Sequence, residues 1–337
     1  MKQHEIFDDQ FIVVTGASGF IGSNVVRYLN DHGRKNLLLV DDLKHSTKWR
    51  NLVQKNFVEF IPKNEIFDFI NGREHEIEGF IHLGACSDTT ETNAEYLFEN
   101  NYRFSIRLAE YALKHDHRFI YASSAATYGN GENGFKDDEA ALESLKPLNM
   151  YAFSKHLFDL WLKKENVLDK VIGLKYFNIF GPNEYHKKNM RSVILKMTHQ
   201  IMKDGKVSLF KSNDPEFADG EQKRDFLYVK DAAKMTSVLL EEAFKDVGGI
   251  YNIGSGVATS WNDLVKMIFE ALGKPVRIEY VPIPHEIAKQ YQNYTCADMR
   301  KFNKIHGKAS KASKTTSLKE AVTDYIQNYI LKDEKCE

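Results

Sequence analysis

The amino-acid sequence predicts an α/β protein with a doubly wound parallel sheet and a smaller α/β domain interleaved with it. Short, unbroken apolar runs alternate with helical patterns along most of the chain, as in folds whose helices cover both faces of a parallel sheet. A glycine-rich loop connects the first of these runs to the first helix. From Asn178 onward, polar and irregular segments interrupt the alternation, which indicates a second domain inserted between parts of the first.

The predicted elements follow in chain order. Strands are expected at 11–14, 37–40, 79–84, 118–124, 171–176, 224–229, 248–256 and 276–282. Helices are expected at 23–32, 94–114, 151–165, 190–203, 230–244, 261–272 and 317–330, the last with Thr316 or Ser317 as its N-cap. We therefore expect a first domain of residues 1–177 plus about 224–252, and a second of residues 178–223 plus about 253–337.

The stretch at 11–22 reads FIVVTGASGFIG and carries three evenly spaced glycines, Gly16, Gly19 and Gly22. Glycines at such positions allow a tight turn, close approach of the backbone to a pyrophosphate, and close packing of the helix on the sheet. Asp41 ends the second apolar run, where a carboxylate accepts hydrogen bonds from an adenosine ribose. The first two glycines stand one residue further apart than in the common fingerprint, and a bare turn is the alternative. Strand, loop, helix, strand and acid together indicate a Rossmann-type dinucleotide site.

Length and composition limit the classes of partner. The 337 residues are 42% hydrophobic and 28% charged, as in ordinary globular proteins with a sizeable core. The formal net charge is −1, so no overall field favours nucleic acid or an anionic membrane surface. We therefore expect a small-molecule substrate, with no nucleic acid and no membrane.

Localisation and metal content follow from what the sequence lacks. No apolar run approaches the roughly 20 residues that span a bilayer, and residues 1–10 lack the apolar segment of a signal peptide. Cys86, Cys296 and Cys336 are too few and too scattered for a disulfide framework or a zinc site. We expect a cytoplasmic protein without a metal.

Tyr151 and Lys155 are the first candidates for chemistry. They stand four residues apart in a predicted helix, so both side chains leave the same face. A neighbouring ammonium favours the phenolate and would lower the tyrosine pKa from about 10 toward neutrality, which makes Tyr151 a candidate general acid/base. Ser123 and Ser124 end the strand 118–124, and their hydroxyls would project into the crevice where α/β sheets bind ligands. A surface position for the Tyr/Lys pair is the alternative, because Y-x-x-x-K is common by chance.

Three motifs in this order carry a resemblance to a known family: GASGFIG at 16–22, SSAATYG at 123–129 and YAFSK at 151–155. They resemble the extended short-chain dehydrogenases/reductases, whose members oxidise and rebuild nucleotide sugars. Four further stretches, at 82–91, 175–190, 219–231 and 291–299, are similar within that family to the epimerases that invert C6 of ADP-heptose. The similarity covers nearly the whole chain after residue 10.

The resemblance implies a hydride shuttle on a tightly bound nicotinamide cofactor, NADP or alternatively NAD. Ser124 would hold the reacting oxygen, while Lys155 would position the nicotinamide ribose and tune Tyr151. Removal of the C6 hydroxyl proton and of a hydride would leave a 6-keto sugar, and Lys187 would serve the opposite face. Without the family context, Lys187 is a solvent-facing lysine beside Lys188. The resemblance also implies a homo-oligomer, a pentamer.

Two sets of binding residues carry over from the family. Cofactor contacts would be Gly16, Gly19, Phe20, Ile21, Gly22, Asp41, Asp42, Lys48, Lys63, Leu83, Gly84, Ala85, Cys86, Ser87, Asn100, Lys155 and Ile179. Substrate contacts would be Ser124, Asn178, Asn189, Lys196, Phe210, Lys211, Ser212, Asn213, Arg224 and Tyr291. Arg224 would hold the diphosphate through its forked donors, with an ion pair to Asp225 or Asp231 as the alternative.

Four positions depart from the family pattern: Leu83 replaces an acidic residue, Asp42 an Asn, Asn189 a Ser and Lys196 a His. The extra carboxylate of Asp42 argues against a 2′-phosphate on the cofactor, whereas Lys48 and Lys63 could offset it.

Three rival activities make different demands on the sequence. A sugar-nucleotide 4,6-dehydratase needs an acid and a base directly after the active-site hydroxyl, where Ala125 and Ala126 stand. A hexose 4-epimerase stays open, because it differs only in the carbon that faces the nicotinamide. A non-catalytic nucleotide sensor would be expected to lose Tyr151 or Lys155, and both are present.

Overall fold

The computed structural model describes residues 9–44, 46–242, 244–288, 291–305, 308–333 and 336–337. Its largest element is a seven-stranded sheet in the order β10-β6-β5-β4-β1-β2-β3, and all neighbouring pairs are parallel. The strands are β1 (Phe11–Thr15), β2 (Leu37–Asp41), β3 (Glu59–Pro62), β4 (Ile77–His82), β5 (Arg118–Ser124), β6 (Ile172–Tyr176) and β10 (Gly249–Ile253). Strand order runs outward in both directions from β1 and β4, which confirms the predicted doubly wound sheet and places its switch point between these two strands.

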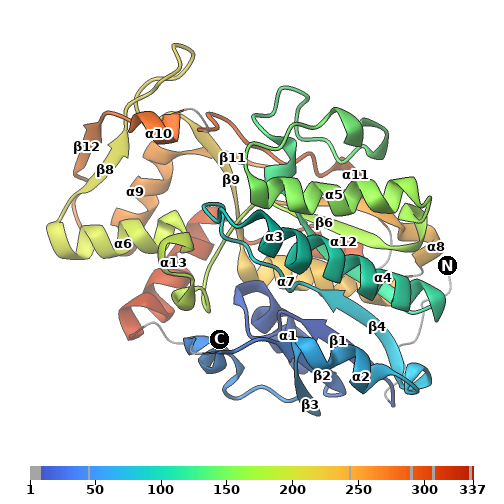
Figure 1. The fold of residues 1–337 in the computed structure, drawn as a ribbon. Coiled ribbons are helices and arrows are strands. Elements are labelled where there is room, and N and C mark those ends of the chain that lie inside the picture. The colour runs from blue at the N-terminus through green and yellow to red at the C-terminus, as the bar shows by residue number, and fades with distance from the viewer. Residues whose placement is uncertain (1–8, 45, 243, 289–290, 306–307, 334–335) are drawn as a thin grey trace.

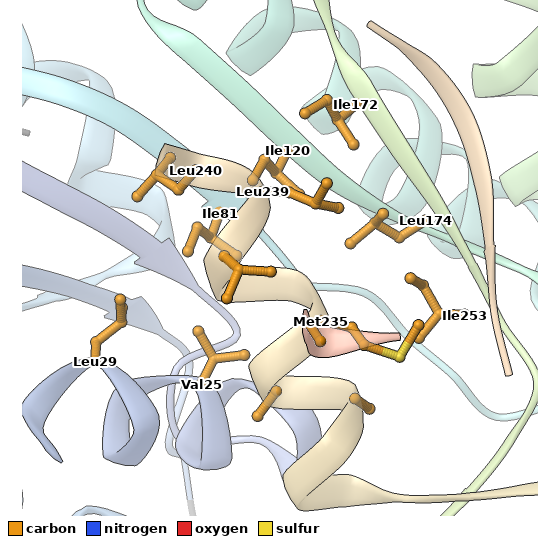
Figure 2. Close-up of a cluster of buried hydrophobic side chains, with 14 of the residues drawn as sticks. Val25, Leu29, Ile81, Ile120, Ile172, Leu174, Met235, Leu239, Leu240 and Ile253 are labelled. Atoms are coloured by element: carbon orange, nitrogen blue, oxygen red, sulfur yellow. The ribbon is translucent and has the colours of Figure 1, made fainter. Parts of the chain in front are cut away.

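Alternate residues of the strands enter two hydrophobic clusters on opposite faces of the sheet. Ile12 and Val14 of β1 pack with α1 (Phe20–Asp31) and α7 (Val229–Val238), and Figure 2 shows this cluster. Val13 belongs to the other cluster, with α2 (Ile66–Ile70), α4 (Phe104–Lys114) and α5 (Met150–Lys164). Because the strands are buried on both faces, their sequences read as unbroken apolar runs.

A smaller α/β part lies on the left of Figure 1. It contains a three-stranded sheet of β11 (Ala258–Ser260), β9 (Lys223–Tyr228) and β7 (Asn178–Phe180), and a parallel pair of β12 (Ile278–Val281) and β8 (Val207–Phe210). Helices α6 (Val193–Asp204), α9 (Trp261–Ala271) and α13 (Leu318–Asn328) pack around a separate hydrophobic cluster. The shorter helices are α3 (Ala94–Leu97), α8 (Phe244–Val247), α10 (His285–Ala288), α11 (Arg300–Asn303) and α12 (Lys308–Ala312).

Polar caps fix where the helices start. The side chain of Asn149 accepts from the backbone N of Ala152 at the start of α5, and Ser192 and Ser260 cap α6 and α9 in the same way. Ser317 and Glu320 form a capping box at α13, so of the two predicted N-cap residues, Thr316 and Ser317, the structure uses Ser317.

Three predicted elements differ from the structure. The predicted helix 94–114 contains a π-helical segment at Phe98–Arg103, and this wider turn carries Asn101, which binds the backbone of Cys86. The strand predicted at 224–229 is β9, in the small sheet. The helix predicted at 230–244 ends at Val238 and passes into a 3₁₀ turn at Leu239–Glu241.

The prediction for the first ten residues falls largely on residues 1–8, which lie outside the described part of the chain. Among the described residues, no helix is both long enough and apolar enough to cross a membrane.

Candidate functional site

A cavity of about 450 Å³ opens at the carboxyl ends of the central strands, where ligands bind in open α/β sheets. It brings together Ser124 at the end of β5, Tyr151 and Lys155 on α5, and Lys187 in the loop after β7. The predicted cofactor residues that line it are Gly16, Gly19, Phe20, Ile21, Gly22, Asp41, Lys48, Leu83, Gly84, Ala85, Cys86, Ser87, Lys155 and Ile179. Residues from distant motifs therefore share one site.

The glycine loop has the geometry of a phosphate cradle. Gly16 has a φ of +67°, and a Cβ there would lie 2.7 Å from the backbone N of Gly84. A Cβ on Gly22 would lie 2.1 Å from the carbonyl oxygen of Gly16. The N-cap of α1 is Gly19, which has no side chain to cover the first N–H groups of the helix. These N–H groups are available to an anion, so the loop fits the pyrophosphate of a dinucleotide.

The Asp41 carboxylate at the end of β2 is held from several sides. It accepts hydrogen bonds from the backbone N of Ser18 (2.9 Å), the Ser18 hydroxyl and the backbone N of Asp42 (2.7 Å), and Lys48 Nζ lies 2.7 Å from Oδ1. Burial acts to raise the pKa of Asp41, but Lys48 and these hydrogen bonds outweigh burial and lower it. Asp41 is thus a carboxylate whose charge Lys48 balances.

A second hollow of about 190 Å³ adjoins Asp41 and is lined by Lys44, Lys48 and Lys63. Lys63 Nζ donates to Asn100 Oδ1 at 2.5 Å, and burial lowers the pKa of Lys63. Asp42 lines the same hollow and pairs with Lys44 at 3.0 Å. The predicted cofactor residues Asp42, Lys63 and Asn100 therefore lie here, beside the larger cavity, where three ammonium groups face two carboxylates.

The segment 83–87 crosses the cavity and is fixed by buried anchors. The backbone N of Gly84 donates to Thr15 Oγ1 (3.1 Å), which is hydrogen-bonded to Nδ1 of His82 (2.6 Å). The side chain of Asn101 accepts from the backbone N of Cys86 (2.8 Å) and donates to its carbonyl (2.9 Å). Burial, with a smaller effect of nearby lysines, lowers the pKa of His82 to about 3, so this ring is neutral.

Tyr151 differs from the expectation in its protonation. Burial raises the pKa of Tyr151, and a hydrogen bond with Ser124 acts in the opposite direction. The predicted lowering by Lys155 is wrong for the protein alone, because desolvation of the phenolate dominates. Ser123 also differs, since its hydroxyl donates to buried Asp159 at 2.8 Å, whereas Ser124 meets Tyr151.

Both candidate lysines are desolvated. Burial lowers the pKa of Lys155 to about 8, although Asp159 acts in the opposite direction. Burial also lowers the pKa of Lys187, with Glu184 opposing and Lys196 reinforcing this effect. The cation that reinforces the lowering is Lys196 of α6. Lys187 Nζ lies 5.2 Å from the centroid of the Phe20 ring, on the cavity side, which disfavours the solvent-facing alternative.

The loop that carries Lys187 is tied to both parts of the fold. Its buried Glu184 accepts hydrogen bonds from the Ser192 hydroxyl (2.6 Å) and from Tyr325 Oη of α13 (3.0 Å). On the other side, the Asn183 side chain donates to the Ser23 hydroxyl of α1 (2.9 Å). These contacts hold the loop over the cavity.

Arg224 is buried between two aromatic rings. Its guanidinium carbon lies 5.6 Å from the Trp261 ring and 5.2 Å from the Tyr291 ring, and it donates to the carbonyls of Lys223 (2.9 Å) and Gln292. Burial lowers the pKa of Arg224 to about 10. The guanidinium is thus held in place by the protein.

The aspartates proposed as alternative partners of Arg224 are engaged elsewhere. The Asp225 carboxylate accepts hydrogen bonds from the backbone N of Ser255 (2.8 Å), Gly256 (2.9 Å) and Ala297 (2.9 Å). Asp231 accepts from the backbone N of Thr316 (2.8 Å). These contacts leave the ion-pair alternative without support.

The remaining predicted substrate residues lie in two places. Phe210 packs edge-on against Tyr291 at 6.2 Å, and Lys211, Ser212 and Asn213 continue the same segment toward Asp219, which accepts from the backbone N of Ser212. Lys196 Nζ donates to the carbonyl of Asn189 at 2.6 Å in the Lys187 loop, and the Asn178 side chain donates to the Asp225 carbonyl at 2.9 Å.

Six cavity residues were missed by the sequence: Asp88, Ala122, Tyr176, Phe177, His186 and Met190. Tyr176 ends strand β6 and Phe177 follows it directly, and an aromatic residue at the carboxyl end of a parallel strand is the signal that could have found these two. Burial, then Lys48 and Lys187, lowers the pKa of His186 to about 4, so its imidazole is neutral in the site.

Comparison with known proteins defines the class. The NAD dependent epimerase/dehydratase family matches residues 12–254, and the chain belongs to this family. It is therefore an enzyme of the epimerase/dehydratase class that uses a nicotinamide cofactor.

Within this family, the chain is most informatively compared with three individual proteins. The chain is 44% identical over 320 residues to the ADP-L-glycero-D-manno-heptose-6-epimerase of Nitratidesulfovibrio vulgaris (strain DP4), covering 94% of this chain and 97% of that protein. It is 40% identical over 334 residues to the protein of the same name from Fusobacterium nucleatum, covering 96% and 99%. The crystal structure of ADP-L-glycero-D-manno-heptose-6-epimerase from Helicobacter pylori is similar with a TM-score of 0.74 and 28% identity, over 95% of this chain and 96% of that one.

Proposed function

We propose that the protein converts ADP-D-glycero-D-manno-heptose to ADP-L-glycero-D-manno-heptose by inverting C6. The names of its relatives support this substrate. The observation that carries the proposal is the meeting of Ser124, Tyr151, Lys155 and Lys187 in one cavity beside the glycine loop. Inversion through a planar ketone needs proton transfer on both faces of the carbon, and this cavity offers one acid/base group from each of two separate segments.

The nicotinamide, when bound, supplies the acceptor and later the donor of the hydride. Ser124, hydrogen-bonded to Tyr151, would bind the C6 oxygen, and Tyr151 would remove its proton as the C6 hydride leaves, which forms a 6-keto sugar. Because burial raises the pKa of Tyr151, its phenolate depends on nearby positive charge. Lys155, buried one helical turn away, is the residue of α5 that can provide this charge.

The ketone then has to receive the hydride on its other face. Lys187, as its ammonium, would deliver the proton to the C6 oxygen there, and its lowered pKa makes that ammonium a stronger acid. A tyrosine held on a helix cannot serve both faces without moving several ångströms, so two groups from different elements are needed.

The residues that would hold the cofactor suit NADP, with NAD as the alternative. The first N–H groups of α1 would bind the pyrophosphate, and Asp41 the adenosine ribose. Lys48 and Lys63 line the hollow beside Asp41, where a 2′-phosphate would lie. We expect NADP⁺ to bind more tightly than NAD⁺ and to lose that preference in Lys48→Met with Lys63→Met; equal binding of both nucleotides by the unaltered protein would favour NAD.

For the substrate, Arg224 would hold the diphosphate, with Phe210 and Tyr291 beside it. Asn178, Asn189, Lys196 and the segment 211–213 would complete the binding surface. We assign cofactor binding to residues 1–177 plus about 224–252 and substrate binding to the rest, although β9 pairs within the small sheet.

The biological setting follows from the family. We propose that the protein acts in the cytoplasm as a homo-oligomer, a pentamer, and supplies heptose for the lipopolysaccharide core. Sedimentation velocity of the purified protein tests the pentamer.

The activity test incubates the purified protein with ADP-D-glycero-D-manno-heptose and, separately, with UDP-glucose, and separates the products by anion-exchange chromatography. We expect conversion of the heptose nucleotide only, and loss of conversion in Tyr151→Phe. Conversion of UDP-glucose to its C4 epimer, with the heptose nucleotide unchanged, would instead identify a hexose 4-epimerase. Bound nicotinamide without turnover of either sugar would identify a sensor.

A further inference from the structure

A buried ion pair lies behind the catalytic residues. Asp159 of α5 and Lys175 of β6 are joined by a 2.7 Å contact between Oδ2 and Nζ, and their side chains are 0% and 1% exposed. Buried charges are costly unless they are paired and hydrogen-bonded. Here the Asp159 carboxylate also accepts from Tyr121 Oη (2.9 Å) and Ser123 Oγ (2.8 Å), so the pair is well satisfied.

The pair is linked to Ser124 through one side chain. Lys175 Nζ donates to Thr127 Oγ1 at 2.6 Å, and Thr127 Oγ1 donates to the carbonyl of Ser124 at 2.7 Å. The neighbouring Ser123 is bound to Asp159 itself. The strand end and turn that present the Ser124 hydroxyl are therefore fixed from behind by the ion pair.

The pair is also linked to Lys155. Asp159 follows Lys155 by one helical turn, so the two side chains are neighbours on α5. Burial lowers the pKa of Lys155 to about 8, and Asp159 is the charged group that opposes this effect. Without the carboxylate, Lys155 would lose its proton at a lower pH.

Other titratable groups surround both residues. His156, Tyr121 and Tyr128 face the ion pair from α5, β5 and the turn after β5. Tyr151 of α5 lines the same cavity as Lys155, and Lys155 contributes to the lowered pKa of His82 of β4, whose ring is neutral. Asp159 thus supplies the negative charge on the Lys155 side of the sheet.

We infer that Asp159 and Lys175 are positioning residues of the reaction: the pair fixes the turn that carries Ser124, and Asp159 holds its carboxylate one helical turn from Lys155. The inference rests on the proposed function for the roles of Ser124 and Lys155. The alternative is an ion pair that contributes only to folding.

The test compares three variants. Asp159→Asn keeps the shape of the side chain and removes its charge. Thr127→Val keeps the ion pair and cuts its link to Ser124. Glu78→Gln is the matched control, because Glu78 pairs with Arg118 at 3.3 Å, with side chains 5% and 10% exposed, at the opposite end of the same sheet.

The first measurement is NADPH affinity between pH 6 and 10, by fluorescence titration without sugar. We expect the affinity of the unaltered protein to fall as the pH rises through about 8, the pKa of buried Lys155. In Asp159→Asn this fall moves roughly one pH unit lower, because a charge within a few ångströms is removed. Glu78→Gln keeps the midpoint of the unaltered protein even where its melting temperature drops. An unchanged midpoint in Asp159→Asn would overturn the electrostatic half of the inference.

The second measurement is the kcat of the epimerisation. In Thr127→Val we expect a loss of roughly tenfold or more, since small misplacements of reacting groups are costly, with NADPH affinity within about twofold of normal. Normal kcat in Thr127→Val would overturn the positioning half, and this variant decides the matter if Asp159→Asn does not fold. Because the first measurement uses no sugar, failure of the unaltered protein to convert the heptose nucleotide counts against the proposed function alone.

Discussion

Gly16→Ala tests the close approach of the first loop to the rest of the site. A Cβ at Gly16 would lie 2.7 Å from the backbone N, 2.8 Å from the Cα of Gly84, and 2.9 Å from the carbonyl carbon of Leu83. All three are backbone atoms, which cannot move aside as a flexible side chain would. The φ of +67° adds the cost of a left-handed conformation for alanine, roughly 1 kcal/mol. With overlap against rigid atoms, we expect the free energy of unfolding to fall by roughly 2–4 kcal/mol in all.

Gly205→Ala separates the two contributions. Gly205 has nearly the same φ, +69°, but a Cβ there would meet no described atom within 4 Å. Its substitution should therefore cost only the conformational part, roughly 1 kcal/mol. Urea denaturation gives both free energies, and NADPH titration shows whether Gly16→Ala alone weakens the cofactor. Equal losses of stability in the two variants, with unchanged NADPH affinity in Gly16→Ala, would refute the proposed contact between the two loops.

Three further predictions concern the chemistry. Tyr151→Phe should lose roughly 10²–10⁴ in kcat while it binds NADPH normally, because only the ionisable hydroxyl is removed; more than about a tenth of the normal kcat would place the base elsewhere. Lys187→Met should slow single-turnover reduction of the cofactor more with one heptose epimer than with the other, since Tyr151 still serves its own face. Equal, near-normal rates with both epimers would show that Lys187 takes no part in proton transfer. Arg224→Lys should raise KM about tenfold with little change in kcat, because an ammonium cannot replace the planar guanidinium between Trp261 and Tyr291. A normal KM in this variant would show that Arg224 does not bind the diphosphate.

The Rossmann half of the fold was predictable because its physical signals are local. Strands β1, β2, β5 and β6 are buried on both faces, so their sequences are apolar runs. The glycines between β1 and α1 indicate the tight turn that the structure contains. The short strands β3, β7, β8 and β11 were missed because three or four residues are too few for a periodic pattern. The placement of β9 in the small sheet depends on pairing with residues distant in the chain, which no local pattern encodes.

The candidate site was predictable as a set of residues and less so as an electrostatic environment. The helical spacing of Tyr151 and Lys155 places them on one face, and the sheet topology brings Ser124 to them. The direction of the Tyr151 pKa shift was wrong because it depends on how much water the fold excludes, and spacing along a helix carries no information on burial. The role of Asp159 could not be predicted from the sequence either, since its partners Tyr121, Ser123 and Lys175 come from two other elements, β5 and β6.

The central claim is inversion of C6 by a hydride that leaves and returns within one active site. Proton NMR of ADP-D-glycero-D-manno-heptose with the purified protein in D₂O, without added cofactor, tests it most directly. We predict that the C6 configuration inverts over time while the C6 position keeps its protium, because the hydride never exchanges with solvent. Inversion with deuterium incorporated at C6 would show removal of that hydrogen as a proton, and an unchanged C6 signal would contradict the proposed activity.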